Sequence, residues 1–411
     1  MYAKKKDKTV QYKSSQMATI PEDRKQSFAN CVFLESVIIP ENIEEINAYY
    51  FYNCSSLKSI KIPYGVSKIC KYAFANCISL ESIIIPDSII EIDEYAFANC
   101  KSLKSITLPS KLIKLGNHAF YECTNLYSIM IPKSQKKIEA STFENCVSLK
   151  QIELPDTLVY IGISAFADCE SLKNIIIPKS VKTICPEAFY NCTSLETITL
   201  PNSIKEIQFS TFENCISLSS IELPKKVNRI SFSSFSNCVA LDKISLPKVK
   251  KIGAHAFSNC LSLKTIILSN NLLAIGTSIF ENCTSLQSIT LPKSIKEIPE
   301  KAFYNCTTLS SITLPREVRK IRLEAFCRCK SLTSIIIPKN VGVIEDEVFR
   351  RCSSLETIIF HNRITSIGNK VFHYCLDLNE LVFYGKIKHW KRIKPTDFPS
   401  YIKVICFDGR I

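Results

Sequence analysis

The sequence is poor in several residues that catalytic sites and membrane spans commonly use. Its 411 residues include one tryptophan, five histidines and nine glycines. No window approaches the roughly 20 apolar residues of a membrane-spanning helix. The lysine-rich N-terminal stretch lacks the apolar core of about 7–15 residues that a secretory signal needs. The sequence therefore predicts a soluble chain without a recognisable export signal, and a cytoplasmic location stays open.

Motifs of common catalytic classes are also missing. The chain has no G-x-x-x-x-G-K-[ST], no G-x-G-x-x-G and no H-E-x-x-H. His118 and His255 occupy equivalent positions far apart in the sequence and cannot cooperate. Catalytic triads form in space, so a sequence alone cannot exclude one. Since no residue stands out as catalytic, cofactor-binding or metal-binding, we expect a protein that is not an enzyme and needs no cofactor.

The net charge of +14 lies largely at the two ends. Residues 1–25 hold seven Lys or Arg against three Asp or Glu, and residues 384–411 hold seven against two. The long middle is only mildly basic. Hydrophobic residues make up 46% of the chain, which is enough for a continuous core.

Cysteine marks a fixed period along nearly the whole chain. Sixteen of the twenty cysteines follow one another at intervals of 23 residues, apart from a single interval of 22 between Cys238 and Cys260. A period in the range of about 20–29 residues is the signature of leucine-rich repeats. One such unit cannot bury its apolar face alone, so neighbouring units stack and share one core.

Each period has the same internal pattern. Phenylalanine stands three residues before the cysteine and leucine three after it in all sixteen repeats, and proline stands nine after it in thirteen. A second apolar pair lies twelve and fifteen after the cysteine and should close the coil. In one repeat Ile198 and Leu200 alternate with Thr197 and Thr199, which is typical of a half-buried strand. Proline cannot donate to a β ladder, so it should end each strand.

The order L-x-x-I-x-L-P, then I-x-x-I, then A-F-x-N-C resembles the BspA-like branch of the leucine-rich repeats over about residues 28–383. The segment from Tyr384-Gly385 through Trp390 to Ile411 resembles the closing unit of that family. The resemblance implies a surface protein of anaerobic bacteria or mucosal protists that attaches to host matrix or to other cells.

We therefore predict a right-handed, curved repeat solenoid with a parallel β ladder of about sixteen 23-residue repeats. The solenoid should span residues 28–383. Residues 1–27 should form a basic tail with a possible N-terminal cap, and residues 384–411 a C-terminal capping unit.

Two repeated polar residues have structural interpretations. The cysteines recur one per coil, unlike the paired ligands of metal sites, and the stacked thiols are poorly aimed for disulfides. We interpret them as small buried residues beside the phenylalanines, as expected in a reducing or anaerobic setting. Asparagine precedes the cysteine in eleven repeats. We expect its side chain to bond backbone groups of the turn, as Asx motifs do.

Two surfaces remain as candidates for binding. The first, the ladder face, consists of the outward strand residues five and seven after each cysteine. Aligned apolar side chains there can mark a protein-binding patch, although residues of high β-propensity would also be expected at these positions. The candidate residues are Ile84, Met130, Ile176, Thr199, Thr290, Ile336 and Ile359.

The second surface, the basic edge, consists of lysines and arginines ten and thirteen residues after the cysteine. It could attract an acidic polymer or an anionic surface, or it could be an ordinary solvated rim. Grooves that bind single-stranded nucleic acid carry aromatic residues between their basic residues, and this edge does not. The sequence therefore does not favour nucleic-acid binding. Its members are Lys133, Lys179, Lys225, Lys248, Lys293, Arg316 and Lys339 at the first position, and Lys136, Lys182, Lys205, Lys296 and Arg319 at the second, with Lys250 in the equivalent place of the repeat that is one residue short.

The sequence thus favours a non-enzymatic, adhesin-like protein that binds a large protein or glycan-bearing partner through the ladder face and the basic edge. By the family resemblance, the partner belongs to host matrix or a cell surface. An intracellular leucine-rich-repeat scaffold for protein–protein interaction is the alternative, supported by the missing export signal and the unpaired thiols.

Overall fold

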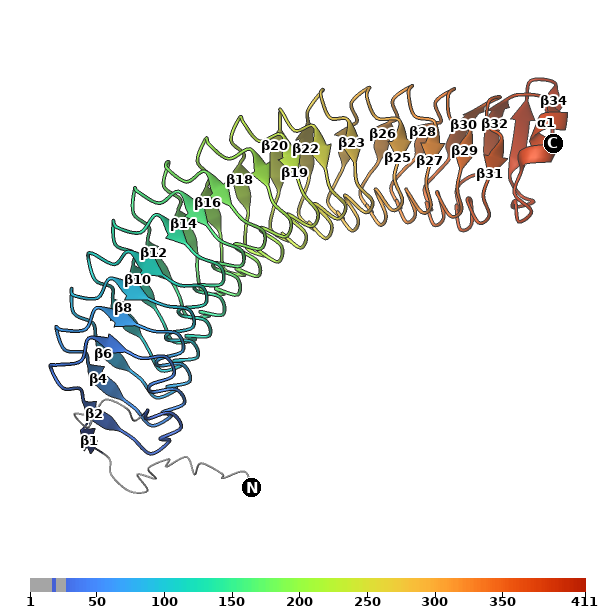
Figure 1. The fold of residues 1–411 in the computed structure, drawn as a ribbon. Helices are drawn as coiled ribbons and strands as arrows, with labels where there is room; N and C mark the ends of the chain where they lie inside the picture. Colours follow the sequence, from blue (N-terminus) through green and yellow to red (C-terminus); the bar gives the residue numbers. More distant parts are fainter. Residues whose placement is uncertain (1–16, 20–26) are drawn as a thin grey trace, which may run out of the picture. The chain divides into compact units, whose positions relative to one another are not determined.

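The computed structural model describes residues 17–19 and 27–411. They fall in two compact units, Met1–Leu172 and Lys173–Ile411, and each unit is a stack of short coils (Figure 1). Each coil spans about 23 residues and carries one strand of a parallel ladder. The predicted fold, a parallel β-ladder solenoid of about sixteen turns, is confirmed.

The main ladder consists of strands that begin five residues after each cysteine. Neighbouring strands are parallel and in register, as in Ser105↔Ser128↔Gln151. In the first unit the strands are β2 (Ser36–Ile38), β4 (Ser59–Lys61), β6 (Ser82–Ile84), β8 (Ser105–Thr107), β10 (Ser128–Met130) and β12 (Gln151–Glu153). In the second they are β14 (Asn174–Ile176), β16 (Thr197–Thr199), β18 (Ser220–Glu222), β20 (Lys243–Leu246), β22 (Thr265–Leu268), β24 (Ser288–Thr290), β26 (Ser311–Thr313), β28 (Ser334–Ile336), β30 (Thr357–His361) and β32 (Glu380–Tyr384).

A second ladder of two-residue strands closes each coil. The sequence predicted that a second apolar pair closes each coil, but it did not predict strands there. The second residue of that pair, fifteen after the cysteine, lies in these short strands and points inward. In the first unit they are β3 (Glu45–Ile46), β5 (Lys68–Ile69), β7 (Glu91–Ile92), β9 (Lys114–Leu115), β11 (Lys137–Ile138) and β13 (Tyr160–Ile161). In the second they are β15 (Thr183–Ile184), β17 (Glu206–Ile207), β19 (Arg229–Ile230), β21 (Lys251–Ile252), β23 (Ala274–Ile275), β25 (Glu297–Ile298), β27 (Lys320–Ile321), β29 (Val343–Ile344) and β31 (Ser366–Ile367).

Proline limits the length of the main strands, as the sequence predicts. Most strands followed by proline have three residues. His361 and Tyr384 stand where proline is usual, and β30 and β32 each extend to five residues, with His361 paired to Tyr384. The backbone N–H that proline lacks is available at these two positions, so the ladder continues.

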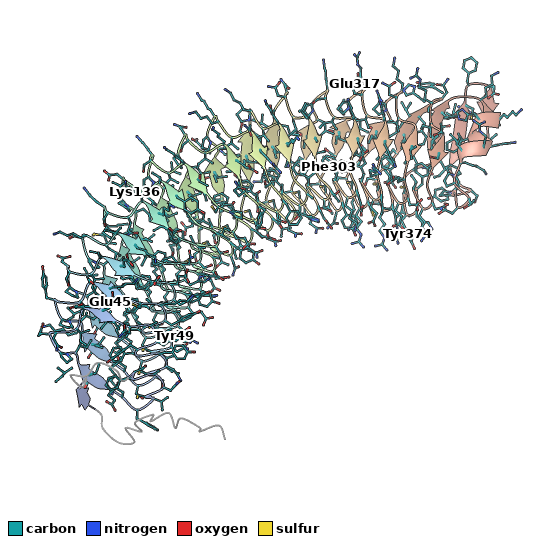
Figure 2. The ribbon with its side chains drawn as sticks, in the orientation of Figure 1. Glu45, Tyr49, Lys136, Phe303, Glu317 and Tyr374 are labelled. Atoms are coloured by element: carbon teal, nitrogen blue, oxygen red, sulfur yellow. The ribbon has the colours of Figure 1, made fainter. Side chains whose placement is uncertain are left out.

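A column of phenylalanine rings fills the centre of each unit. Phe51 and Phe74 stack with ring centroids 5.1 Å apart, and Phe235 and Phe257 stack at 5.4 Å, with interplanar angles of 11° and 1°. These rings are fully buried, and Figure 2 shows Phe303 inside its coil while Glu317 lies at the surface. Offset stacking adds about 0.5–1.5 kcal/mol per pair to the burial of the rings.

The turn after each phenylalanine depends on a left-handed backbone conformation. Asn282 has a φ of 60°, and the residues before the other repeat cysteines also have positive φ. Asparagine tolerates this region better than most residues with a side chain. The prediction that these asparagine side chains bond to the backbone is wrong for Asn282. Its Nδ2 donates to Asn259 Oδ1 at 2.7 Å, and its Oδ1 accepts from Asn305 Nδ2 at 2.9 Å. The coil spacing brings equivalent amides within reach, so they bond to one another.

The two ends of the ladder differ from the repeats. Strand β1 (Met17–Thr19) pairs in parallel with β2, and the rest of the predicted basic tail lies outside the described residues up to residue 26. At the other end, helix α1 (Ile387–Ile393) follows β32, and β33 (Lys403–Cys406) then pairs in parallel with β32. Strand β34 (Gly409–Arg410) turns back antiparallel to β33.

The phenylalanine column generates a stability prediction. Phe212 is fully buried between Phe189 and Phe235, at centroid distances of 5.7 and 5.4 Å. We expect Phe212→Ala to lower the free energy of unfolding by about 3–5 kcal/mol, because it removes two stacked contacts and leaves a cavity. Urea unfolding followed by circular dichroism measures this change.

Phe209, 44% exposed in the same coil, provides the matched control. Phe209→Ala should change the free energy of unfolding by less than about 1 kcal/mol. Equal losses in the two variants would contradict the stacking argument.

Candidate binding face

The ladder face is solvent-exposed where the sequence predicts it. Ile84, Ile176 and Ile336 are 62%, 82% and 60% exposed, while the next residue inward on each strand is buried. Met130 is 63% exposed, and Thr199 and Thr290 are exposed as well. The period-two pattern of the strands places these residues, because alternate side chains of a strand point to opposite faces.

Ile359 lies on the ladder face as predicted but is less exposed than the other candidate residues. Its side chain is only half exposed. In β30 it pairs with Ile336 of β28 on one side and with Val382 of β32 on the other. Two aliphatic neighbours cover part of Ile359, so these three residues form a continuous apolar strip that the prediction missed in part.

Other exposed residues were also missed. Ile267 of β22 is 64% exposed, and Ile38 of β2 is 55% exposed. Both stand seven residues after a cysteine, which is the signal that identified the other ladder-face residues. Completing that column over all repeats would have found them.

The basic edge is exposed and carries little compensating charge in the second unit. Lys179, Lys225 and Lys339 are exposed, and in the part of the chain that the structure describes no carboxylate lies within 4.0 Å of their amino groups. Arg316 does pair, with Glu317 at 2.9 Å. Between residues 179 and 339, neither position of the basic edge holds Asp or Glu. A line of like charges in that setting attracts anionic groups.

Shallow hollows join the ladder face to the basic edge. Each is lined by ladder-face residues of adjacent strands and by one lysine of the basic edge. The hollows at Lys133 and Lys225 also include a ladder-face glutamate, Glu153 and Glu222 respectively. The pairs and volumes are Met130 with Lys133 (about 580 Å³), Thr199 with Lys225 (about 560 Å³) and Thr290 with Lys293 (about 490 Å³). The two candidate surfaces are therefore contiguous at these coils, where hydroxyl, apolar and cationic groups lie together, with a carboxylate at Glu153 and at Glu222.

The repeat cysteines do not contribute a reactive site. All twenty cysteines lie in the described part of the chain, none of them forms a disulfide, and most are buried. In most repeats the thiol donates a hydrogen bond to a phenylalanine carbonyl of the preceding coil, as Cys123 Sγ does to Phe97 O at 3.2 Å. Burial raises the pKa of Cys123 to about 12 and that of Cys260 to about 12. Because the thiolate is the nucleophile, these groups are unreactive near neutral pH.

A family model described as a BspA type leucine rich repeat region of six copies matches residues 23–150, 136–264 and 250–379. These matches cover most of the chain. The chain belongs to the BspA-type leucine-rich-repeat family.

Solved structures of other leucine-rich-repeat proteins resemble this BspA-type chain. One from Bacteroides ovatus ATCC 8483 is 28% identical with a TM-score of 0.60, covering 92% of this chain and 85% of the other. A leucine rich cell surface protein from Faecalibacterium prausnitzii A2-165 is 28% identical with a TM-score of 0.39, covering 90% and 85%. A search of curated proteins gives no match.

Membership of this family indicates a protein-binding scaffold, and such solenoids are typically non-enzymatic. Within residues 17–19 and 27–411, the structure holds no helix of the length and hydropathy that a membrane crossing requires. In the same residues, no three His, Cys, Asp or Glu side chains come together as metal ligands.

Thiol burial generates a labelling prediction for this BspA-type chain. Cys31 and Cys70 are half-buried, whereas the other cysteines are buried. At about pH 8 we expect a thiol-reactive disulfide reagent to label these two cysteines first, because the reagent reaches the others only when coils open. In concentrated guanidinium chloride all twenty should react.

The double variant Cys31→Ser and Cys70→Ser serves as the control and should lose the fast phase of labelling. Fast labelling of most cysteines in the native protein would show that the thiols are accessible and would contradict the burial argument.

Proposed function

We propose that this BspA-type solenoid is an adhesin-like binding protein without enzymatic activity. It engages a large protein or glycan-bearing partner across the ladder face and the basic edge. The observation that carries the proposal is the repeated hollow in which a ladder-face residue and a lysine lie side by side, as Thr290 and Lys293 do.

The chemistry of the face suits an extended partner. The residues five after the cysteines supply mostly hydroxyl groups, and those seven after add exposed aliphatic side chains such as Ile176 and Ile336. Exposed apolar groups favour association with protein surfaces where they adjoin, as Ile336, Ile359 and Val382 do. The lysines of the basic edge add attraction for acidic groups and faster encounter. Because each coil contributes little, affinity accumulates over several coils.

A location at the cell surface is part of the proposal. The related chain from Faecalibacterium prausnitzii is described as a cell surface protein. The alternative is an intracellular scaffold, which the free thiols support, since disulfides are rare in reducing compartments. The surface of an anaerobe is also reducing, so thiol state alone does not separate the two locations.

Protease treatment of intact source cells tests the location. If the protein lies outside, peptides of this chain are released before lysis. Complete protection until lysis, with a known surface protein cleaved in parallel, would favour the scaffold alternative instead.

The ladder face generates a binding prediction. We expect the triple variant Ile84→Ser, Ile176→Ser and Ile336→Ser to weaken adhesion to plates coated with fibronectin, laminin or collagen by about 10-fold or more, since each lost apolar contact is worth on the order of 1 kcal/mol. These side chains are already exposed, so thermal unfolding should shift little.

A second triple variant provides the matched control: Ile78→Ser, Ile163→Ser and Ile216→Ser change exposed isoleucines outside both the ladder face and the basic edge. It should keep adhesion within about 2-fold of the parent. Unchanged adhesion in the folded ladder-face variant would reject this surface.

A further inference from the structure

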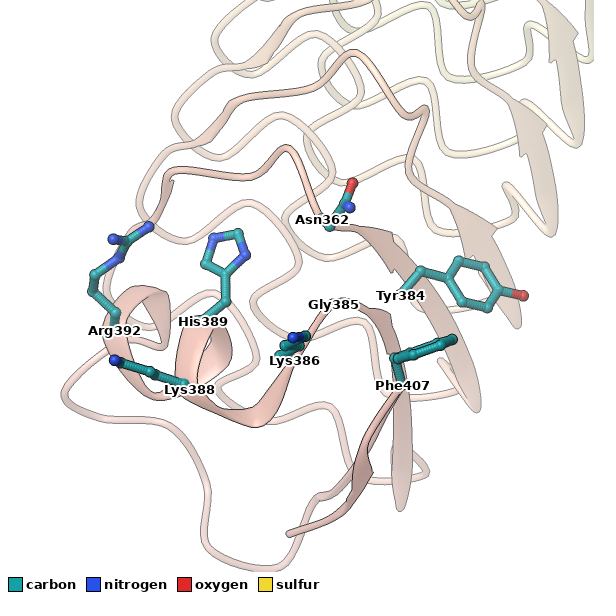
Figure 3. Close-up of a pocket in the computed structure, with 8 residues that line it drawn as sticks. All are labelled: Asn362, Tyr384, Gly385, Lys386, Lys388, His389, Arg392 and Phe407. Atoms are coloured by element: carbon teal, nitrogen blue, oxygen red, sulfur yellow. The ribbon is translucent and has the colours of Figure 1, made fainter.

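A basic hollow of about 780 Å³ lies at the C-terminal end of the second unit (Figure 3). It is separate from the hollows of the ladder face. Cations, two aromatic rings and an amide surround it: Lys386, Lys388, Arg392, Tyr384, Phe407 and Asn362. Cavities of about 300–1,000 Å³ are typical of sites for small ligands.

Helix α1 holds the cations of this hollow in place. Trp390 and Ile393 are buried on its inner face. The centroid of the Trp390 ring lies 5.5 Å from that of Phe383 and 5.3 Å from that of Phe398. His389 Nε2 lies 2.9 Å from the carbonyl oxygen of Ile364, so it donates a hydrogen bond there. Buried packing thus fixes the helix.

Lys388 and Arg392 are four residues apart and line the same hollow. Residues at this spacing share a face of a helix. Figure 3 shows both side chains on the helix, with Lys386 just before it.

The positive charge of the hollow is not neutralised. Lys386, Lys388 and Arg392 are exposed, and among the described residues none has a carboxylate within 4.0 Å. Asp408 is the acidic residue next to the lining residue Phe407, and its Oδ1 accepts a hydrogen bond from the Ile387 N–H at 2.7 Å. Three cations and no carboxylate stand among the residues that line the hollow. This lining favours an anionic ligand, and the planar guanidinium suits carboxylate or sulfate.

Two aromatic residues of the hollow favour an acidic sugar over an acidic peptide as its ligand. Phe407 is 84% exposed and Tyr384 is 55% exposed, and Figure 3 shows both on the side of the hollow away from the helix. A pyranose ring has an apolar C–H face that packs on such rings, while its hydroxyl groups need donors and acceptors. The exposed Asn362 amide offers both. A fully charged peptide would leave the aromatic faces unused.

We propose that this hollow binds a segment of an acidic oligosaccharide, with its carboxylate or sulfate groups on Lys386, Lys388 and Arg392. One sugar ring packs against Phe407 and Tyr384. The site acts in addition to the ladder face and does not depend on it.

The single tryptophan of the chain supplies a local readout, because Trp390 packs on the inner side of the helix that carries Lys388 and Arg392. We expect a heparin-derived hexasaccharide, titrated into the full chain, to change the fluorescence of Trp390 and to bind more weakly as salt is raised. A neutral chitin hexasaccharide should not bind. An equal response to hexaglutamate would overturn the sugar assignment and indicate an acidic peptide, and no response to heparin would overturn the site.

Two pairs of substitutions separate binding in this hollow from nonspecific attraction to positive charge. Lys388→Gln with Arg392→Gln should weaken heparin binding by about 10-fold or more, because hydrogen bonds to charged groups are worth about 1.5–3 kcal/mol. The matched pair Lys264→Gln with Lys330→Gln changes exposed lysines outside both the hollow and the basic edge, and should keep heparin binding within about 2-fold. Phe407→Ala should weaken binding while the salt dependence remains. Equal losses in the two charge pairs would mean nonspecific attraction and would overturn the proposal.

The ladder-face triple variant keeps the two proposals distinguishable. It should lose adhesion to matrix proteins and retain the fluorescence response to the hexasaccharide. Loss of the heparin response in that variant would show that the hollow does not act independently.

Discussion

Every coil must present the same surface to the coil before it and to the coil after it, and this constraint fixes the interior. Phenylalanine rings stack directly on phenylalanine rings, with centroid distances such as 5.1 Å for Phe51 and Phe74. Cysteine thiols then fall beside neighbouring carbonyls and asparagine amides beside amides. A substitution at any of these positions changes two interfaces together, which is why the interior residues recur from coil to coil.

The outside of the coils is free of this constraint. Seven residues after the cysteine the chain uses Ile176, Thr199 and Glu222 in three successive coils, although their backbones pair in one register. The ladder can therefore hold a varied series of side chains on a uniform scaffold. At Ile336, Ile359 and Val382 the series is apolar, and the strip is continuous because parallel in-register pairing places equivalent residues side by side.

The periodic features were predictable from the sequence, and the features that depend on contacts between coils were not. Alternation around Ile198 predicted the main strands, and the spacing of the cysteines predicted buried thiols. The strands of the second ladder were not predicted, because two residues such as Glu45 and Ile46 are too few to show a period. The hydrogen bonds between asparagine amides could not be predicted, because they depend on the distance between neighbouring coils. The hollow beside α1 could not be predicted either, because it forms only where the fold brings together Asn362, Arg392 and Phe407, which are separated in the sequence.

The left-handed turn before each repeat cysteine bears on how such a chain changes over generations. Asparagine fills this turn in most coils, yet Asp168, Arg328 and Tyr374 adopt the same positive φ. The turn is thus set by the coil as a whole and not by one side chain. The chain enters and leaves each coil in the same direction, so in-frame duplication or loss of a coil joins compatible ends. Such an event would lengthen or shorten the ladder by whole coils without disturbing the turns on either side.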